Sequence, residues 1–147
     1  RNRMAQVGIQ RALDELTGDH LAWIDDLPET LSCCDGRVKV VHGHPDDPDR
    51  YTYPDEFGPG LLGDEDVLVM GHTHIQHAEQ FEAGIVVNPG SVGQPRDNDP
   101  RAGYAVVDLD ALTVDTDRVE YDVEAVAAAV EDAGFPHMSA ERLKRGE

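Results

Sequence analysis

Four of the seven histidines fall in two His-x-His pairs, each placed directly after a short strand-like apolar run. His42 and His44 form the first pair, and His72 and His74 form the second. Residues two apart in an extended backbone project to the same side, so each pair is able to aim both imidazoles at one point. Neutral imidazole is the commonest metal ligand in proteins. The spacing therefore predicts a metal site with His42, His72 and His74 as ligands.

The alternative is that these histidines are ordinary surface residues. One His-x-His pair often has no function, but two pairs that each follow an apolar run and adjoin a glycine rarely arise by chance. His20, His77 and His137 lie in polar, helical or connecting sequence, and we interpret them as solvated surface residues. Metal binding is therefore assigned to the two pairs, with the role of His44 left open.

A glycine-rich turn from Asn88 to Ser91, followed by Arg96, is a candidate anion site. Backbone amides in such a turn are able to form an anion-binding nest, and the Arg96 guanidinium offers a forked donor to phosphate. Gly-Ser turns are also common in loops without function. Asn88 and Arg96 are therefore candidate substrate-binding residues only in combination with the histidines.

The elements that must position these residues are mainly strands. The dipeptide Asp35-Gly36 predicts a hairpin over Thr30–His42, with a second strand over Arg37–His42. Later strands are predicted by three apolar runs and one alternating segment: Val67–Met70, Ile85–Val87, Tyr104–Leu109 and Leu112–Tyr121. The first two runs are apolar throughout, which is typical of strands buried on both faces. The alternating segment Leu112–Tyr121 is predicted to be an edge or half-exposed strand.

Helical spacing is found at both ends of the chain. A helix is predicted over Asn2–Leu16, and a second is capped by Asp19 and ended by Pro28. A third is capped by Asp122 and ended by Gly134, and a last short helix begins after Ser139. The class is therefore α+β, with a sheet covered by helices.

The long segment from Pro45 to Gly63 has the composition of a loop. Its aromatic residues Tyr51, Tyr53 and Phe57 predict an ordered loop that covers a neighbouring surface. Such a loop beside strand tips is the expected specificity element, able to stack a nucleotide base or to close an interface.

The charge of the chain is strongly negative: 12 Lys and Arg against 30 Asp and Glu give a formal net charge of −18. Such a surface repels duplex nucleic acid and anionic membranes. Abundant carboxylate with very little lysine resembles proteins of salt-loving archaea, and an ordinary acidic protein is the alternative.

The 147 residues fit one domain, and no apolar run is long enough to cross a bilayer. No secretory or transit segment is visible, so a cytoplasmic protein with reduced thiols is expected. Cys33 and Cys34 are adjacent on a predicted strand, where their side chains would point to opposite faces. Because the chain begins at Arg1 and not at methionine, we expect a fragment or an excised domain.

The Gly-His-Thr-His motif, the upstream His-Gly-His and the Asn-Pro-Gly-Ser turn, in this order and each after a strand, resemble the calcineurin-like metallophosphoesterases, in their compact archaeal and bacterial phosphodiesterase branch. The resemblance covers essentially the whole chain. It implies a four-layer α/β/β/α sandwich with two divalent metal ions at the strand ends. Mn²⁺ is expected, with Ni²⁺, Fe²⁺ and Zn²⁺ left open.

Carried over by motif, the resemblance makes His42 and His72 ligands of the second metal and His74 a ligand of the first. His44 matches a position near the substrate, as a candidate catalytic residue. The turn from Asn88 to Ser91 matches an element at the edge of the site that supports it.

The chain also departs from the family pattern. The N-terminal motifs Asp-x-His, Gly-Asp-x-x-Asp and Gly-Asn-His-Asp are not present, and Gly18-Asp19-His20 and Gly63-Asp64 are imperfect echoes of them. Residues 1–147 are therefore expected to be the C-terminal portion of a single metallophosphoesterase domain. Without a bridging carboxylate, a close metal pair is not expected from this chain by itself.

The intact parent protein is expected to hydrolyse phosphate mono- or diesters, with a small phosphate ester or a nucleotide as substrate. This chain would supply the histidine ligands and would be inactive on its own. Two alternatives stay open: a non-catalytic interaction scaffold, because the retromer small subunit resembles the same family, and an inactive metal-binding fragment. Homo-oligomerisation is also left open.

Overall fold

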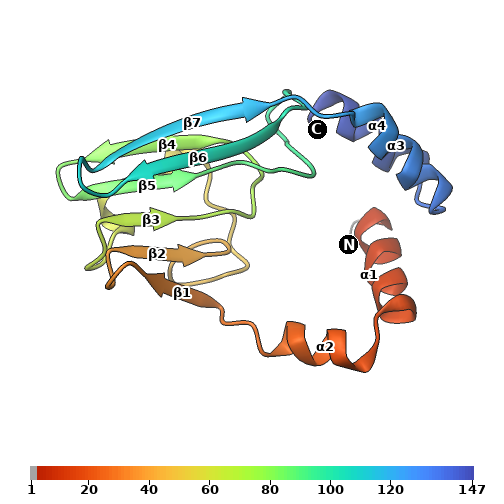
Figure 1. The fold of residues 1–147 in the computed structure, drawn as a ribbon, viewed down its shortest axis with the longest axis horizontal. Helices are drawn as coiled ribbons and strands as arrows, with labels where there is room; N and C mark the ends of the chain where they lie inside the picture. Colours follow the sequence, from red (N-terminus) through yellow and green to blue (C-terminus); the bar gives the residue numbers. More distant parts are fainter. Residues whose placement is uncertain (1–2) are drawn as a thin grey trace.

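The computed structural model describes residues 3–147, which form a five-stranded sheet and a two-stranded sheet, with helices at both ends of the chain (Figure 1). The strand order of the larger sheet is β1-β2-β3-β5-β4. Its central strands β2, β3 and β5 are parallel, and the edge strands β1 and β4 run antiparallel to their neighbours. The bounds are β1 Thr30–Cys33, β2 Val38–Val41, β3 Val67–Val69, β4 His77–Phe81 and β5 Gly84–Asn88.

The predicted hairpin over Thr30–His42 is confirmed by the antiparallel pairing of β1 with β2. Its turn contains Asp35 and Gly36, both with positive φ, as the dipeptide predicts. Cys34 also has a φ of 55°, so it belongs to the turn. The prediction that both cysteines lie in a strand is therefore wrong for Cys34, although both thiols are free and exposed.

The two sheets pack face to face. The smaller sheet consists of β6 (Ala102–Asp108) and β7 (Thr113–Val119), which pair antiparallel. Its inner side chains cover one face of the larger sheet, where three aliphatic residues of β3 and β5 are buried: Val67, Ile85 and Val87. Along β7, Val114 and Arg118 are half-buried and the other residues are exposed, which confirms its prediction as a half-exposed strand.

The opposite face of the larger sheet is covered by the loop that connects β2 to β3. Leu68, Met70 and Val86 are buried there under apolar side chains that include Phe57, Leu61 and Leu62 from the loop. Two short 3-10 helices, Pro54–Glu56 and Pro59–Leu61, order this segment. Parallel neighbours require a crossover connection, and here the crossover is this ordered loop.

Strand β4 was not predicted from the sequence. His77 is predicted to be a solvated surface residue, but it begins β4 and is half-buried. Its ring lies 4.9 Å from the ring of Phe57, and its Nε2 lies 2.9 Å from Glu79 Oε1. The segment is too polar to show strand periodicity, and pairing with β5 stabilises it as an edge strand.

The helices follow the predicted class, with shifted ends. The helix predicted over Asn2–Leu16 is α1 (Arg3–Glu15), and Asn2 lies outside the described residues. The others are α2 (Gly18–Asp25), α3 (Val123–Asp132) and α4 (His137–Arg145). The cap of α2 is Thr17 and not Asp19, because the Thr17 hydroxyl accepts from the backbone of His20. Helix α4 begins before Ser139, directly after Pro136.

Helices α3 and α4 pack on one another and lie beyond one end of the sheets (Figure 1). Helix α1 lies beside them in the same figure. Arg11 of α1 donates to the carbonyl of Ala133, and its guanidinium lies over the ring of Phe135. The fold is therefore mixed α+β, with two packed sheets as its core.

Candidate functional site

The carboxyl ends of three parallel strands meet at one edge of the larger sheet. His42 follows β2, Gly71 and His72 follow β3, and Asn88 ends β5. The amide of Gly71 donates to the carbonyl of His42 at 2.9 Å, which joins the first two strand ends. The ring centroids of His42 and His72 are 4.5 Å apart. Two of the three predicted ligands are therefore brought into contact.

The Gly-His-Thr-His segment is not extended. His72 and His74 have φ angles of 65° and 61°, in the left-handed region that non-glycine residues rarely occupy. The expectation that these two rings align through extended backbone is therefore wrong. Residues held in this conformation persist only where their surroundings stabilise it, and such residues cluster at functional sites.

Asn88 is the residue that holds this segment in place. Its side chain is 1% exposed, and its amide nitrogen donates to the carbonyl of Gly71 at 2.8 Å and to the hydroxyl of Thr73 at 2.9 Å. Its oxygen accepts from the amide of Gly90 at 2.9 Å. The Asn88 side chain therefore lies beneath the histidine segment and fixes its backbone, and does not face solvent.

Two of the histidines are oriented by backbone carbonyls. His72 Nε2 lies 3.1 Å from the Asp49 carbonyl, and His74 Nδ1 lies 2.7 Å from the Gln94 carbonyl. A carbonyl only accepts hydrogen bonds, so these nitrogens carry the hydrogen. The lone pair of the neutral ring then lies on Nδ1 of His72 and on Nε2 of His74. Metal-binding histidines are oriented in this way almost without exception.

Burial lowers the pKa of His74, and the bond to the Gln94 carbonyl opposes that effect. The neighbouring charges of Arg96, His72 and His42 lower the pKa further. The neutral form that binds metal is therefore favoured at His74.

His44 lies at the start of the loop that covers the sheet. Its Nδ1 accepts from the amide of Asp46 at 3.1 Å, so the neutral ring carries its hydrogen on Nε2. Its backbone exchanges two hydrogen bonds with Asp47. A Cβ at Gly43 would come within 2.5 Å of the carbonyls of Pro48 and Arg50, so only glycine allows the loop to approach the histidines this closely.

Arg96 lies beside His74, since its amide donates to the His74 carbonyl at 3.1 Å. Its Nη2 donates to Gln94 Oε1 at 3.1 Å, whereas its buried Nε has no hydrogen-bond partner among residues 3–147. Arg96 as a whole is half-buried, and a guanidinium group is a forked donor that suits an anion.

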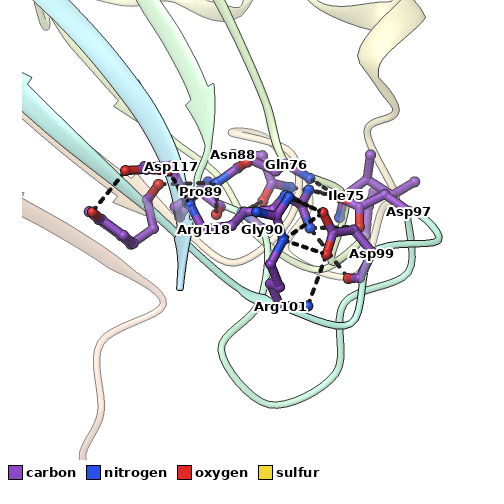
Figure 2. Close-up of polar contacts among 12 residues, drawn as sticks. Ile75, Gln76, Asn88, Pro89, Gly90, Asp97, Asp99, Arg101, Asp117 and Arg118 are labelled. Carbon is purple, nitrogen blue, oxygen red and sulfur yellow. Dashed lines mark hydrogen bonds and ion pairs between the residues drawn. The ribbon is translucent and has the colours of Figure 1, made fainter. Parts of the chain in front are cut away.

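A polar network beneath the site joins it to the smaller sheet, as Figure 2 shows. Asp97 Oδ2 accepts from Arg118 Nη2 at 2.5 Å and from the amide of Gln76 at 3.0 Å. The Gln76 side chain donates to the carbonyls of Pro89, Tyr104 and Asp117. Gln76 and Asp97 follow the Gly-His-Thr-His and Asn-Pro-Gly-Ser motifs, but their polarity alone does not predict the network.

Burial raises the pKa of Asp97, but hydrogen bonds from Arg118 and from the Gln76 amide outweigh it and hold the pKa below its ordinary value. Asp99 has a pKa of about 2, chiefly because Arg101 donates to it. Both carboxylates are therefore ionised at neutral pH. Asp99 therefore contributes stability above pH 3.8 and loses it as the pH falls towards 2, and Asp97 likewise loses its contribution on acidification.

Removing Arg118 is expected to destabilise the fold. Arg118→Met should lower the free energy of unfolding by about 3 kcal/mol, because Asp97 would stay buried without its partner. Arg145→Met is the control, since Arg145 is exposed on α4 and its pair with Glu141 contributes at most about 1 kcal/mol. Urea unfolding followed by circular dichroism measures both. Equal losses of unfolding free energy in the two variants would show that the network contributes little to stability.

The described residues do not form a self-contained metal centre. Across residues 3–147, no group of three or more His, Cys, Asp or Glu side chains is arranged to hold a metal ion. His42 and His72 form a ring pair, and His74 does not complete a three-residue group with them. A single ion held by all three histidines is therefore not supported. Separately, no helix in this part of the chain is long and apolar enough to cross a membrane.

Residues 15–112 match the family model described as the calcineurin-like phosphoesterase superfamily domain. The chain is 26% identical to an uncharacterised protein of Methanocaldococcus jannaschii, over 99% of this chain and 67% of that protein. It is 38% identical to phosphodiesterase YfcE of Escherichia coli, over 53% of this chain and 38% of that protein.

Solved structures show the same fold. A metallophosphoesterase from Sphaerobacter thermophilus matches 91% of this chain with a TM-score of 0.78 and 31% identity, and 65% of that structure is covered. A hypothetical protein from Pyrococcus horikoshii matches 91% of this chain with a TM-score of 0.77 and 22% identity, and 57% of it is covered. The chain thus spans about two thirds or less of the relatives that it matches.

Proposed function

Because the chain belongs to the calcineurin-like phosphoesterase superfamily, we propose that the full-length protein is a metal-dependent hydrolase of phosphate mono- or diesters. The observation that carries this proposal is the orientation of His72 and His74. In each ring one nitrogen donates to a backbone carbonyl, which leaves the other nitrogen free to bind metal.

The proposed ligands divide into two groups. His42 and His72 would hold one divalent ion, and His74 would contribute to a second. Bound divalent ions would polarise the phosphoryl oxygens, and Mn²⁺ is the proposed metal, with Ni²⁺, Fe²⁺ and Zn²⁺ as alternatives. The remaining ligands, including a bridging carboxylate, would come from residues outside these 147, so we propose that the chain is the C-terminal portion of the catalytic domain.

The other site residues have roles in binding and proton transfer. Arg96 would donate to a phosphoryl oxygen, because its half-buried guanidinium is a forked donor and its backbone is bonded to His74. His44 would act as general acid in its imidazolium form, giving the Nε2 proton to the leaving group and returning to neutral imidazole, with Asp46 Oδ2, 3.9 Å from Nδ1, as the partner of the charged ring. Asn88 would position the histidine segment from below and would not touch the substrate.

A scaffold function is the second candidate, and exposed apolar side chains favour it. Several large apolar residues of α1, α2 and β1 face solvent, among them Ile9, Leu13, Trp23, Ile24 and Leu31. Surfaces of this kind mark contacts with other protein segments. They are compatible with an enzyme as well, since residues outside the 147 could cover them, and activity therefore decides between the two functions.

Metal removal tests the proposal. Full-length protein treated with EDTA should hydrolyse bis(p-nitrophenyl) phosphate at a rate reduced at least about 100-fold, and added Mn²⁺ should restore the rate. The assay is run in molar KCl and in dilute buffer, because we also propose that the net charge of −18 reflects a cytoplasm of high salt. Protein that hydrolyses no phosphate ester with any of the four metals would favour the scaffold.

A further inference from the structure

Two tyrosines extend the histidine pair towards solvent. The ring of Tyr51 lies on the ring of His72, with centroids 3.9 Å apart. The rings of Tyr51 and Tyr53 are 6.1 Å apart and inclined by only 15°. Tyr51 is 44% exposed and Tyr53 is 46% exposed. A continuous series of aromatic rings therefore runs from His42 through His72 and Tyr51 to Tyr53.

The segment that carries both tyrosines is held in place at several points. The amide of Tyr53 donates to Glu56 Oε2 at 2.9 Å, and Glu56 Oε1 accepts from Arg50 Nη2 at 2.8 Å. The Asp49 carbonyl is bonded to His72, and Thr52 is buried. A ligand that stacks on these rings would therefore bind to a preformed surface, with little loss of conformational entropy.

We propose that Tyr51 and Tyr53 form a stacking surface for an aromatic group of the phosphate ester, either a nucleobase or another aryl ring. The proposal rests on the hydrolysis proposed above, because it names the substrate class of that same site. Stacking of a base on an aromatic side chain contributes about 1–3 kcal/mol, equivalent to roughly 5- to 150-fold in affinity.

Charge on the same loop narrows the substrate class further. Asp46, Asp47, Asp49 and Asp55 lie on this segment, and Arg50 is already paired with Glu56. A neutral aromatic ring is not repelled by the charge of these carboxylates, whereas additional phosphate groups are repelled by it. The surface therefore favours a diester with a single negative charge over a polyphosphate or a dianionic monoester.

Three diesters with a common leaving group test the stacking surface in the full-length protein. These are the p-nitrophenyl esters of methyl phosphate, phenyl phosphate and thymidine 5′-phosphate. Wild-type protein should show a higher kcat/KM for the phenyl or thymidine ester than for the methyl ester. Tyr53→Leu should lower that preference at least about fivefold, mainly through KM. A preference for the thymidine ester over the phenyl ester would identify a nucleobase, and the reverse would identify a simple aryl ring.

Tyr104→Leu is the matched control. Tyr104 is 43% exposed, but it lies on β6 in the smaller sheet and its hydroxyl bonds to Asp117. This variant should keep the substrate preference of the wild type. An equal preference in the wild type, Tyr53→Leu and Tyr104→Leu would overturn the proposal.

A binding measurement separates this proposal from the proposed activity. Thymidine carries no phosphate, and its binding to EDTA-treated protein is followed by saturation-transfer NMR of the base protons. The signal should be present in the wild type and Tyr104→Leu and lost in Tyr53→Leu. If no ester is hydrolysed, the proposed activity fails, and the thymidine signal alone then decides the stacking surface. Equal signals in all three proteins would refute stacking, and the absence of any signal would refute stacking of a nucleobase.

Discussion

Replacing His72 with alanine is expected to reduce metal-dependent hydrolysis by the full-length protein more than about 100-fold, while the fold stays intact. Loss of a residue that only orients a metal ligand already reduces metal affinity or activity about 10- to 100-fold, so loss of the ligand itself should exceed that range. His72 is half-buried and lies in the segment after β3, outside the buried clusters of both sheet faces. Its removal therefore leaves core packing unchanged.

The measurement for His72→Ala combines three readings: hydrolysis of bis(p-nitrophenyl) phosphate, bound Mn²⁺ by elemental analysis, and thermal unfolding. His137→Ala is the control, because His137 is exposed at the start of α4 and contacts Glu131. The control should retain full activity and full metal content. Comparable activity in both variants would contradict the assignment of His72 as a ligand.

Replacing Asn88 with aspartate is expected to impair both stability and activity. The carboxylate would face the Gly71 carbonyl at the position where the amide nitrogen now donates, in a site that is 1% exposed. The loss of two donated hydrogen bonds and the burial of a charge should lower the free energy of unfolding by about 3 kcal/mol. The left-handed conformations of His72 and His74 would also lose their support, so metal affinity should fall.

Asn98→Asp is the control for this substitution. Asn98 also has a positive φ, of 66°, but its side chain is exposed in the loop after Arg96. The change in unfolding free energy should stay within about 0.5 kcal/mol, as is usual for surface substitutions. Urea unfolding and Mn²⁺ titration measure both variants. If Asn88→Asp binds Mn²⁺ as tightly as Asn98→Asp, then Asn88 does not position the histidines.

Those parts of the fold that have a strong local signal were predictable. The Asp35-Gly36 turn has a backbone requirement that few other dipeptides meet, and the runs at Val67 and Ile85 are apolar because both faces of the sheet are covered. Strand β4 could not be predicted, since the polar sequence of His77–Phe81 becomes a strand only by pairing with β5. The capping hydroxyl of Thr17 also depends on local geometry.

The candidate site, like the fold, was predictable only in part. The spacing of the histidines indicated which residues gather at the strand ends, and the contact of His42 with His72 agrees with it. The left-handed conformation of His72 and His74 was not predictable, because it depends on Asn88 and on bonds from later segments. The ion pair between Asp97 and Arg118 joins residues that are far apart in sequence, and a polar pattern alone does not specify it.

The parallel arrangement of β2, β3 and β5 has a consequence for the order of folding. His42 and His72 become neighbours only after the crossover between β2 and β3 has closed, and Asn88 joins them only when β5 has paired. Contacts between segments so distant in sequence form slowly, because the entropy of loop closure opposes them. The proposed metal binding by these histidines would therefore follow sheet assembly. Bound ions would prolong the lifetime of the assembled state and would not nucleate it.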